Sequence, residues 1–211
     1  MGTIDTGRVL ETAVPDAGSF GGSEPLTGWR VWRVSFRRKT PELRAITETE
    51  TWPAGKRMRA ACRITAHAAP TEGCRCGIYG FAEPMPPPYG LPAAGFVVVG
   101  QVALWGQVVV HCAGYRAEFA YPQRLGFFCM RCLEERRAVP AEVVLRDSPY
   151  GPLCSHHRGF KGEPVEPILQ TLLNRYRVDR LAPEPLAGGL IRSPEPAFDE
   201  SLWWGWGAMA R

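Results

Sequence analysis

The stretch FVVVGQVALWGQVVVHC, residues 96–112, is the most apolar window of the chain and decides the fold. Its two Val-rich halves, 96–104 and 107–112, have the composition of buried strands. Trp105-Gly106 stands between them, and a turn there would fold the halves into a hairpin of core strands. Gly, Gln and His residues interrupt the window, so it predicts no membrane-spanning segment.

Shorter stretches with strand-like composition lie on both sides of this predicted hairpin, at residues 7–14, 29–36, 43–51, 58–67 and 114–122. Residues 37–42 have the character of a turn. The 23 Gly and 20 Pro residues also favour short strands and many turns over long helices. We therefore predict an α+β, mainly β fold: a small antiparallel β-barrel or sandwich, then a zinc-ribbon or treble-clef-like module and one amphipathic helix.

Composition divides the 211 residues into four parts. Residues 1–25 are predicted to be a flexible arm, 26–122 a β domain, 123–181 a zinc module plus helix, and 182–211 a flexible Pro/Gly/Trp tail. The helix is predicted within 164–181, where six apolar residues recur at helical spacing: Val165, Ile168, Leu169, Leu172, Leu173 and Tyr176.

Two pairs of metal-ligand residue types lie in the predicted zinc module. Cys129 and Cys132 form a Cys-x-x-Cys knuckle, and Cys154 and His157 repeat the two-residue gap after twenty-one residues. Two such pairs complete the tetrahedral shell of one structural zinc ion. His156 is the alternative fourth ligand, but His157 preserves the spacing. A closed shell of three Cys and one His leaves no open position for catalysis.

A second cluster, Cys62, His67, Cys74 and Cys76, lies within fifteen residues. Its Cys-x-Cys spacing is less specific, and three interpretations stay open: a second metal site, a reactive thiol activated by Arg75, or packing in the core. Cys112, on a Val-rich strand, is expected in the core.

The net charge of +4 is unevenly distributed, because residues 28–63 carry ten Lys or Arg against three Glu. This asymmetry indicates a polyanionic partner such as nucleic acid, although a solvated Arg-rich sheet face would give the same pattern. The candidate phosphate contacts are Arg30, Arg33, Arg37, Arg38, Lys39, Lys56, Arg57 and Arg59.

The tail carries Leu202, Trp203, Trp204 and Trp206, which predict either a docking peptide for a protein partner or a segment that folds back onto the β domain. No phosphate-binding Gly loop or hydrolase motif is present in the sequence. An enzyme acting on a nucleotide or small molecule would have to use His111, Arg116 and Glu118 beside Cys74 and Cys76. An Arg116–Glu118 pair is otherwise expected to form a surface salt bridge.

Residues 1–14 carry three charges and lack the apolar segment of a signal peptide, so we expect a cytoplasmic protein whose seven cysteines are thiols or metal ligands. The stretches 67–70, 74–79, 100–106 and 114–118 (His-Ala-Ala-Pro, Cys-Arg-Cys-Gly-Ile-Tyr, Gly-Gln-Val-Ala-Leu-Trp-Gly and Gly-Tyr-Arg-Ala-Glu) are similar to a bacterial protein group of actinobacterial or mobile-element type. That resemblance implies no activity and no catalytic residue. The leading hypothesis is a zinc-stabilised adaptor that contacts nucleic acid or a nucleic-acid-processing complex, and the alternatives are an enzyme and an assembly component.

Overall fold

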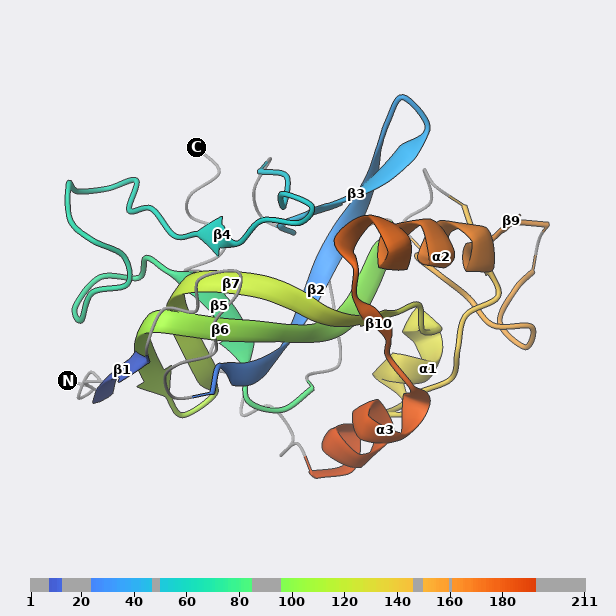
Figure 1. Ribbon diagram of the computed structural model, residues 1–211. Helices are drawn as coiled ribbons and strands as arrows, with labels where there is room; N and C mark the ends of the chain where they lie inside the picture. The colour runs from blue at the N-terminus through green and yellow to red at the C-terminus, as the bar shows by residue number, and fades with distance from the viewer. Residues whose placement is uncertain are drawn as a thin grey trace.

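The fold was taken from a computed structural model, which describes residues 8–12, 24–46, 50–84, 96–145, 150–159 and 161–192 (Figure 1). It is mainly β, as predicted from the sequence. The strands are β1 (Arg8–Thr12), β2 (Leu26–Arg37), β3 (Thr40–Arg44), β4 (Met58–Arg59), β5 (Ile78–Phe81), β6 (Val97–His111), β7 (Gly114–Gly126), β8 (Val143–Val144), β9 (Glu163–Pro164) and β10 (Asp179–Arg180). The helices are α1 (Met130–Glu134), α2 (Val165–Tyr176) and α3 (Pro183–Arg192).

Strands β6 and β7 form the centre of the sheet and pair antiparallel along most of their length. The prediction of a hairpin inside residues 96–112 is wrong, because β6 runs unbroken through Trp105 and Gly106. The register of the β6–β7 pair shifts between Trp105 and Val108, and Gly106 has a φ of +76°. Gly106 thus supplies the left-handed conformation of a β-bulge, which bends a strand without ending it.

Four strands pair in a closed cycle: β6 with β2, β2 with β5, β5 with β7, and β7 with β6. The contact between β2 and β5 is the narrowest link in this cycle, with Trp29 opposite Phe81 as its one paired position. It depends on close approach at two glycines, because a Cβ on Gly28 would lie 3.2 Å from the Cα of Gly80. The distinction between barrel and sandwich stays a prediction.

Two of the predicted strands are shorter than expected. Among the described residues of the stretch 43–51, β3 contributes only its end, and an isolated bridge between Arg44 and Thr51 follows. The stretch 58–67 contributes only the two residues of β4, and the chain then enters a loop that contains Cys62 and His67. Short Ala-rich sequence with little alternation lacks an apolar face that would hold it in a sheet.

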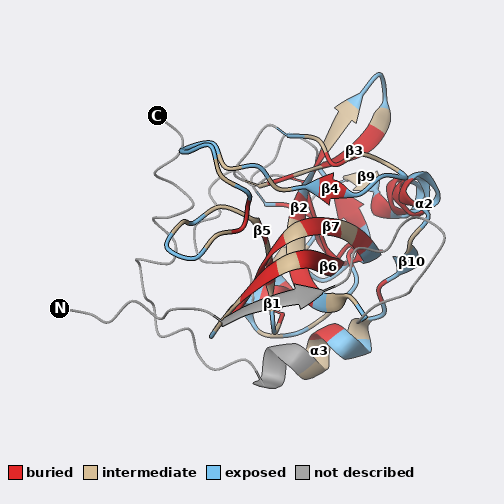
Figure 2. Cartoon of the chain, turned by 60° about the vertical axis from the view of Figure 1, so that its left-hand side comes forward, coloured by how far each residue is buried: buried red, intermediate tan, exposed pale blue. Residues whose placement is uncertain are grey.

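The main core lies between the sheet and α2, whose six predicted apolar side chains are all buried. Figure 2 shows this buried layer running through β6 and β7 to the inner face of α2. Trp32 and Trp52 meet edge to face in this core, with ring centroids 5.4 Å apart. The buried carboxylate of Glu42 on β3 accepts a 2.8 Å bond from Arg175 on α2. The same core therefore includes residues from both sides of the predicted boundary at 122.

The sequence did not predict α3, which lies within the part assigned to a flexible tail. Pro183 occupies its first position, where a missing N–H is tolerated, and Leu186 is buried against Trp29 and Leu133. The expectation for Cys112 is also wrong: it is exposed, because it lies in the turn between β6 and β7.

Candidate metal centres

The structure brings together Cys129, Cys132, Cys154 and His157, whose ligand atoms all lie within 4.8 Å of one another. The Nδ1 atom of His157 is 3.3 Å from the sulfurs of Cys129 and Cys132 and 3.5 Å from that of Cys154. The sulfurs of Cys132 and Cys154 are 3.9 Å apart. We call this group the buried cluster, since its three cysteines are buried.

These spacings match a tetrahedral shell. Ordinary zinc–sulfur and zinc–nitrogen bond lengths place two sulfurs about 3.8 Å apart, and a sulfur and a nitrogen about 3.6 Å apart. The observed separations of 3.3 to 3.9 Å lie close to these values. The imidazole of the neighbouring His156 stands edge-on to that of His157 and is not one of the four.

Two short turns position the buried cluster. Cys129 precedes α1 and donates its N–H to the carbonyl of Val139, while Cys132 lies within the helix. The carbonyl of Cys154 accepts from the N–H groups of His157 and Arg158, which closes the second turn. Burial, with the neighbouring sulfur of Cys129, raises the pKa of Cys132 to about 12.

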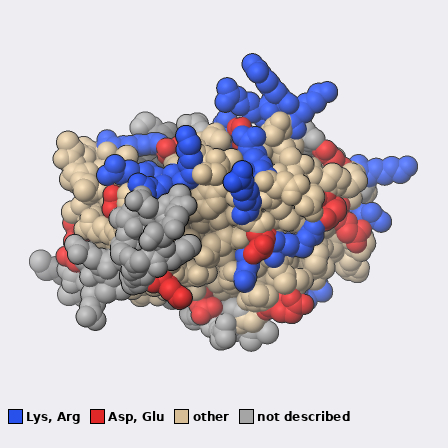
Figure 3. Space-filling model, viewed as in Figure 1, with Lys and Arg blue, Asp and Glu red and all other residues tan. Residues whose placement is uncertain are grey.

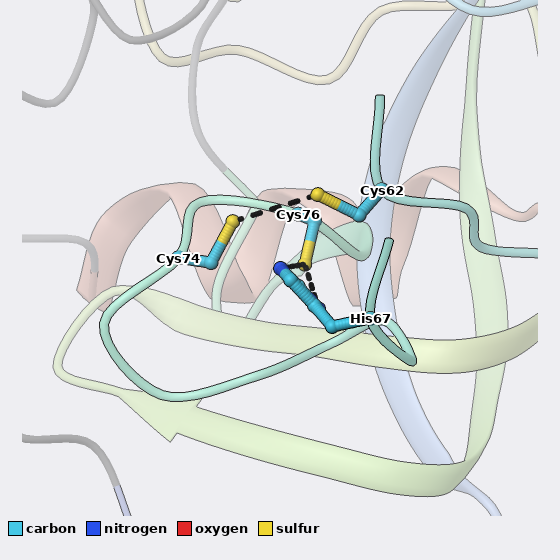
Figure 4. A group of neighbouring side chains, drawn as sticks. All are labelled: Cys62, His67, Cys74 and Cys76. Carbon is cyan, nitrogen blue, oxygen red and sulfur yellow. Dashed lines mark hydrogen bonds between the residues drawn. The ribbon is translucent and has the colours of Figure 1, made fainter. Parts of the chain in front are cut away.

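The structure also brings together Cys62, His67, Cys74 and Cys76, again with all ligand atoms within 4.8 Å (Figure 4). The sulfurs of Cys62 and Cys74 are 3.8 Å apart, and the sulfur of Cys76 is 4.0 Å from the Nε2 atom of His67. All four residues are partly exposed. We call this group the loop cluster, because its members lie in the segment between β4 and β5.

The thiols of the loop cluster are not equivalent. Backbone and side-chain hydrogen bonds from Thr65 lower the pKa of Cys62 to about 6. Burial raises the pKa of Cys76 to about 11. Core packing, one of the three interpretations of this sequence, does not describe four partly exposed residues whose polar atoms converge.

Arg116 on β7 binds the backbone of the loop cluster, a role that was not predicted from the sequence. Its guanidinium donates to the carbonyls of Cys74 and Cys76, the latter at 2.9 Å, and to Nε2 of His111 at 2.7 Å. Arg116 is only 5% exposed, so its side chain serves these contacts inside the fold and is not presented to solvent. Glu118 pairs instead with Arg59, at 3.3 Å. The expected Arg116–Glu118 salt bridge is thus replaced by two separate contacts.

Most of the predicted phosphate-contacting residues lie on the surface, and Figure 3 shows Lys and Arg side chains gathered over the β2–β3 hairpin and β4. Arg33, Arg37, Arg38, Lys39, Lys56, Arg57 and Arg59 are exposed. Arg30 differs, since it lies over the Trp52 ring and donates to the carbonyl of Tyr79, so its contacts are structural. The predicted docking residues Leu202, Trp203, Trp204 and Trp206 lie outside the described residues.

All seven cysteines are free thiols. Each of the two clusters could hold a metal ion. Among the described helices, none combines the length and the apolar character needed to cross a bilayer. Comparison of the chain with protein-family models, with characterised proteins and with solved structures gives no match. The resemblance to a bacterial group and the cytoplasmic location therefore stay predictions.

Proposed function

We propose that this protein is a zinc-stabilised module that binds nucleic acid through the tip of its β2–β3 hairpin. In this proposal zinc occupies the buried cluster as a zinc-ribbon or treble-clef-like structural site beside a small β-barrel. Three thiolates and one imidazole in tetrahedral spacing are the ligands that zinc prefers, and the closed shell assigns the ion to folding and not to catalysis.

The observation that carries the nucleic-acid proposal is the conformation of the hairpin turn. Its two central residues, Arg38 and Lys39, both have positive φ, at 49° and 68°. Such a two-residue turn favours Asn-Gly, because Asn tolerates the left-handed region better than most side chains and Gly has no Cβ to be strained there. Two cations in a strained turn indicate selection for what they contact, since the fold alone would favour other residues.

The position of the turn supports the same conclusion. The paired part of β2 and β6 ends at Arg33, and β2 and β3 continue as a two-stranded ribbon. The base of this ribbon, with Val34 and Leu43, is buried in the core, and its tip around Arg38 and Lys39 projects (Figure 1). A ribbon of this kind fits the major groove of duplex DNA. Among the described residues, Arg37, Arg38 and Lys39 at the tip have no ion-pair partner, which leaves their charges available to phosphates.

Lys56 and Arg57, on the approach to β4, are two further exposed cations. The guanidinium of Arg57 lies 4.4 Å from the centre of the Phe119 ring, which holds the charge at the surface without neutralising it. Together with the hairpin tip this gives five cations. Five phosphate contacts on duplex DNA predict that the logarithm of the association constant falls with log salt at a slope of about −4.5.

The test is fluorescence anisotropy of labelled duplex DNA, single-stranded DNA and RNA with the full chain, at a series of salt concentrations. The key variant is R38N/K39G, which removes two cations and installs the sequence that the turn prefers. We expect the variant to be at least as stable as wild type, to bind at least tenfold more weakly, and to reduce the salt slope by about 2.

The matched control is R158Q/K161Q, which removes two exposed cations between the buried cluster and β9. It changes the net charge equally but leaves the hairpin intact, so affinity should fall much less. Binding that does not depend on salt, no binding at low salt, or equal losses in both variants would contradict the proposal.

A further inference from the structure

We propose that the loop cluster is a second zinc site, which exchanges its ion with solvent more readily than the buried cluster does. This inference is independent of nucleic-acid binding. It rests on the convergence of four ligand atoms from Cys62, His67, Cys74 and Cys76, on the construction of the loop that carries them, and on the difference in burial between the two clusters.

The spacing of the ligand atoms fits a metal better than a disulfide. The sulfurs of Cys62 and Cys74 are 3.8 Å apart, which is the separation expected across a tetrahedral zinc ion and far from a bonded pair at about 2.05 Å. A disulfide would use two thiols and give no reason for a third thiol and an imidazole to face the same point. Figure 4 shows the four side chains turned inward from one loop.

The orientation of His67 suits coordination through its Nε2 atom. Nδ1 lies 2.7 Å from the carbonyl of Ala68 and 3.1 Å from the hydroxyl of Thr71. Both ring nitrogens lie 4.0 Å from the sulfur of Cys76. The carbonyl beside Nδ1 favours the proton on that nitrogen, which leaves the lone pair of Nε2 for a metal. Metal-bound histidines usually have such a carbonyl or carboxylate partner on their second nitrogen.

The loop that carries the four ligands needs a source of stability other than packing and secondary structure. Residues 60–77, between β4 and β5, contain neither helix nor strand. Their buried residues are Ala69 and Pro70, and the largest aliphatic side chain, Ile64, is 65% exposed. A loop of this length without secondary structure is unusual in a compact fold, and this one buries too little apolar surface to offset its ordering entropy. Zinc binding would supply that free energy.

Arg116 positions two of the four ligands. By donating to the carbonyls of Cys74 and Cys76 it fixes both ends of the Cys-x-Cys segment, so the two thiols reach one point despite the short spacing. A Cβ on Gly77 would lie 3.0 Å from the Cβ of Arg116, so the loop closes directly over this side chain. The fold therefore holds the segment ready for an ion.

The two sites differ in how far their cysteines are buried. The cysteines of the buried cluster are 0 to 4% exposed, whereas every member of the loop cluster is partly exposed. A chelator can approach the loop cluster and withdraw its ion stepwise, but it reaches the buried cluster only after local opening. The loop cluster should therefore release zinc much faster.

The test measures the zinc content of the full chain purified under reducing conditions, followed by zinc release to a chromophoric chelator. We expect two zinc ions per chain, one released at least tenfold faster than the other. C62S/C74S should retain one ion and lose the fast phase. C112S, which changes an exposed cysteine outside both clusters, should keep two ions and both phases.

One ion per chain that persists in C62S/C74S would overturn the inference, as would two ions released at the same rate. A Cys62–Cys74 disulfide that persists through purification under reducing conditions would do so too. If C62S/C74S fails to fold, titration of metal-free wild type with Co²⁺ decides the matter. Thiolate-to-cobalt absorption should grow to two equivalents, and saturation at one would refute the second site.

Discussion

Two buried polar side chains, Tyr176 and Arg116, hold segments distant in sequence through bonds to the main chain. The Tyr176 hydroxyl accepts from the N–H of Leu43 at 2.9 Å and donates to the carbonyl of Trp52 at 3.0 Å. It thereby joins the end of α2 to β3 and to Trp52 in the segment after it. Most of their partners are backbone groups, which any sequence would provide, so the sequence does not show these contacts.

Removal of the Tyr176 hydroxyl should therefore destabilise the fold. Y176F leaves a buried N–H and a buried carbonyl without their partner, and we expect a loss of about 2 kcal/mol in the free energy of unfolding. Urea denaturation measures this loss. Y150F, at a tyrosine that is 56% exposed, is the control and should change stability by less than about 0.5 kcal/mol. Equal effects would show that the Tyr176 network contributes nothing specific.

Arg116 gives a prediction about zinc retention. R116K keeps the charge but loses the planar fork that reaches two carbonyls and His111 together. We expect zinc release from the loop cluster to accelerate at least tenfold, in line with other outer-shell substitutions, while release from the buried cluster stays unchanged. The slow phase is thus an internal control. Equal acceleration of both phases would indicate general destabilisation instead.

At the scale of elements, the long strand β6 and the helix α2 differ in how well the sequence predicts them. Helix α2 was predicted because its apolar stripe repeats at helical spacing and is used in full for packing. In β6, the Trp105-Gly106 pair was interpreted as a turn, since a glycine in a turn and a glycine in a bulge look alike until the neighbouring strand is known. Helix α3 was missed because two prolines and Gly188-Gly189 resemble a linker.

The packing of α2 can be tested by one substitution on each face. L172A removes a fully buried side chain from the core between α2 and the sheet, and should cost about 2 to 5 kcal/mol of stability. Q170A, on the exposed face of the same helix, should change it by less than about 0.5 kcal/mol. Both changes in stability are measured as shifts of the denaturant midpoint, provided that the m value of the unfolding transition is the same in each variant. A small loss for L172A would mean that α2 is not part of the cooperative core.

For the whole molecule, the residues that the structure brings together in each cluster could be predicted from the sequence, since each cluster draws its Cys and His residues from one or two short segments of the chain. It did not predict how exposed each cluster is, because burial depends on the sheet and helices that surround it. It also predicted the basic region, but not that its cations would divide between a projecting hairpin and structural contacts such as that of Arg30.

Removal of zinc should lower the stability of the whole chain. A ligand at a thousand times its dissociation constant stabilises the folded state by about 4 kcal/mol, so we expect a chelator to lower Tm by many degrees. Restoring Zn²⁺ should restore Tm, whereas Mg²⁺ should not, because it prefers oxygen ligands. Thermal melting followed by circular dichroism is the measurement, and an unchanged Tm in the metal-free protein would argue against a structural ion.

The two clusters close loops of different length. Cys62 and Cys76 are fourteen residues apart, and Cys129 and His157 are twenty-eight apart. Doubling a loop raises the entropic cost of its closure by about 0.6 kcal/mol, so chain entropy favours assembly of the loop cluster by roughly threefold. Loop length alone would thus make zinc binding tighter at the loop cluster than at the buried cluster. If the buried cluster retains zinc longer, its advantage comes from the core around it, and the order in which the sites fill need not be the order in which they empty.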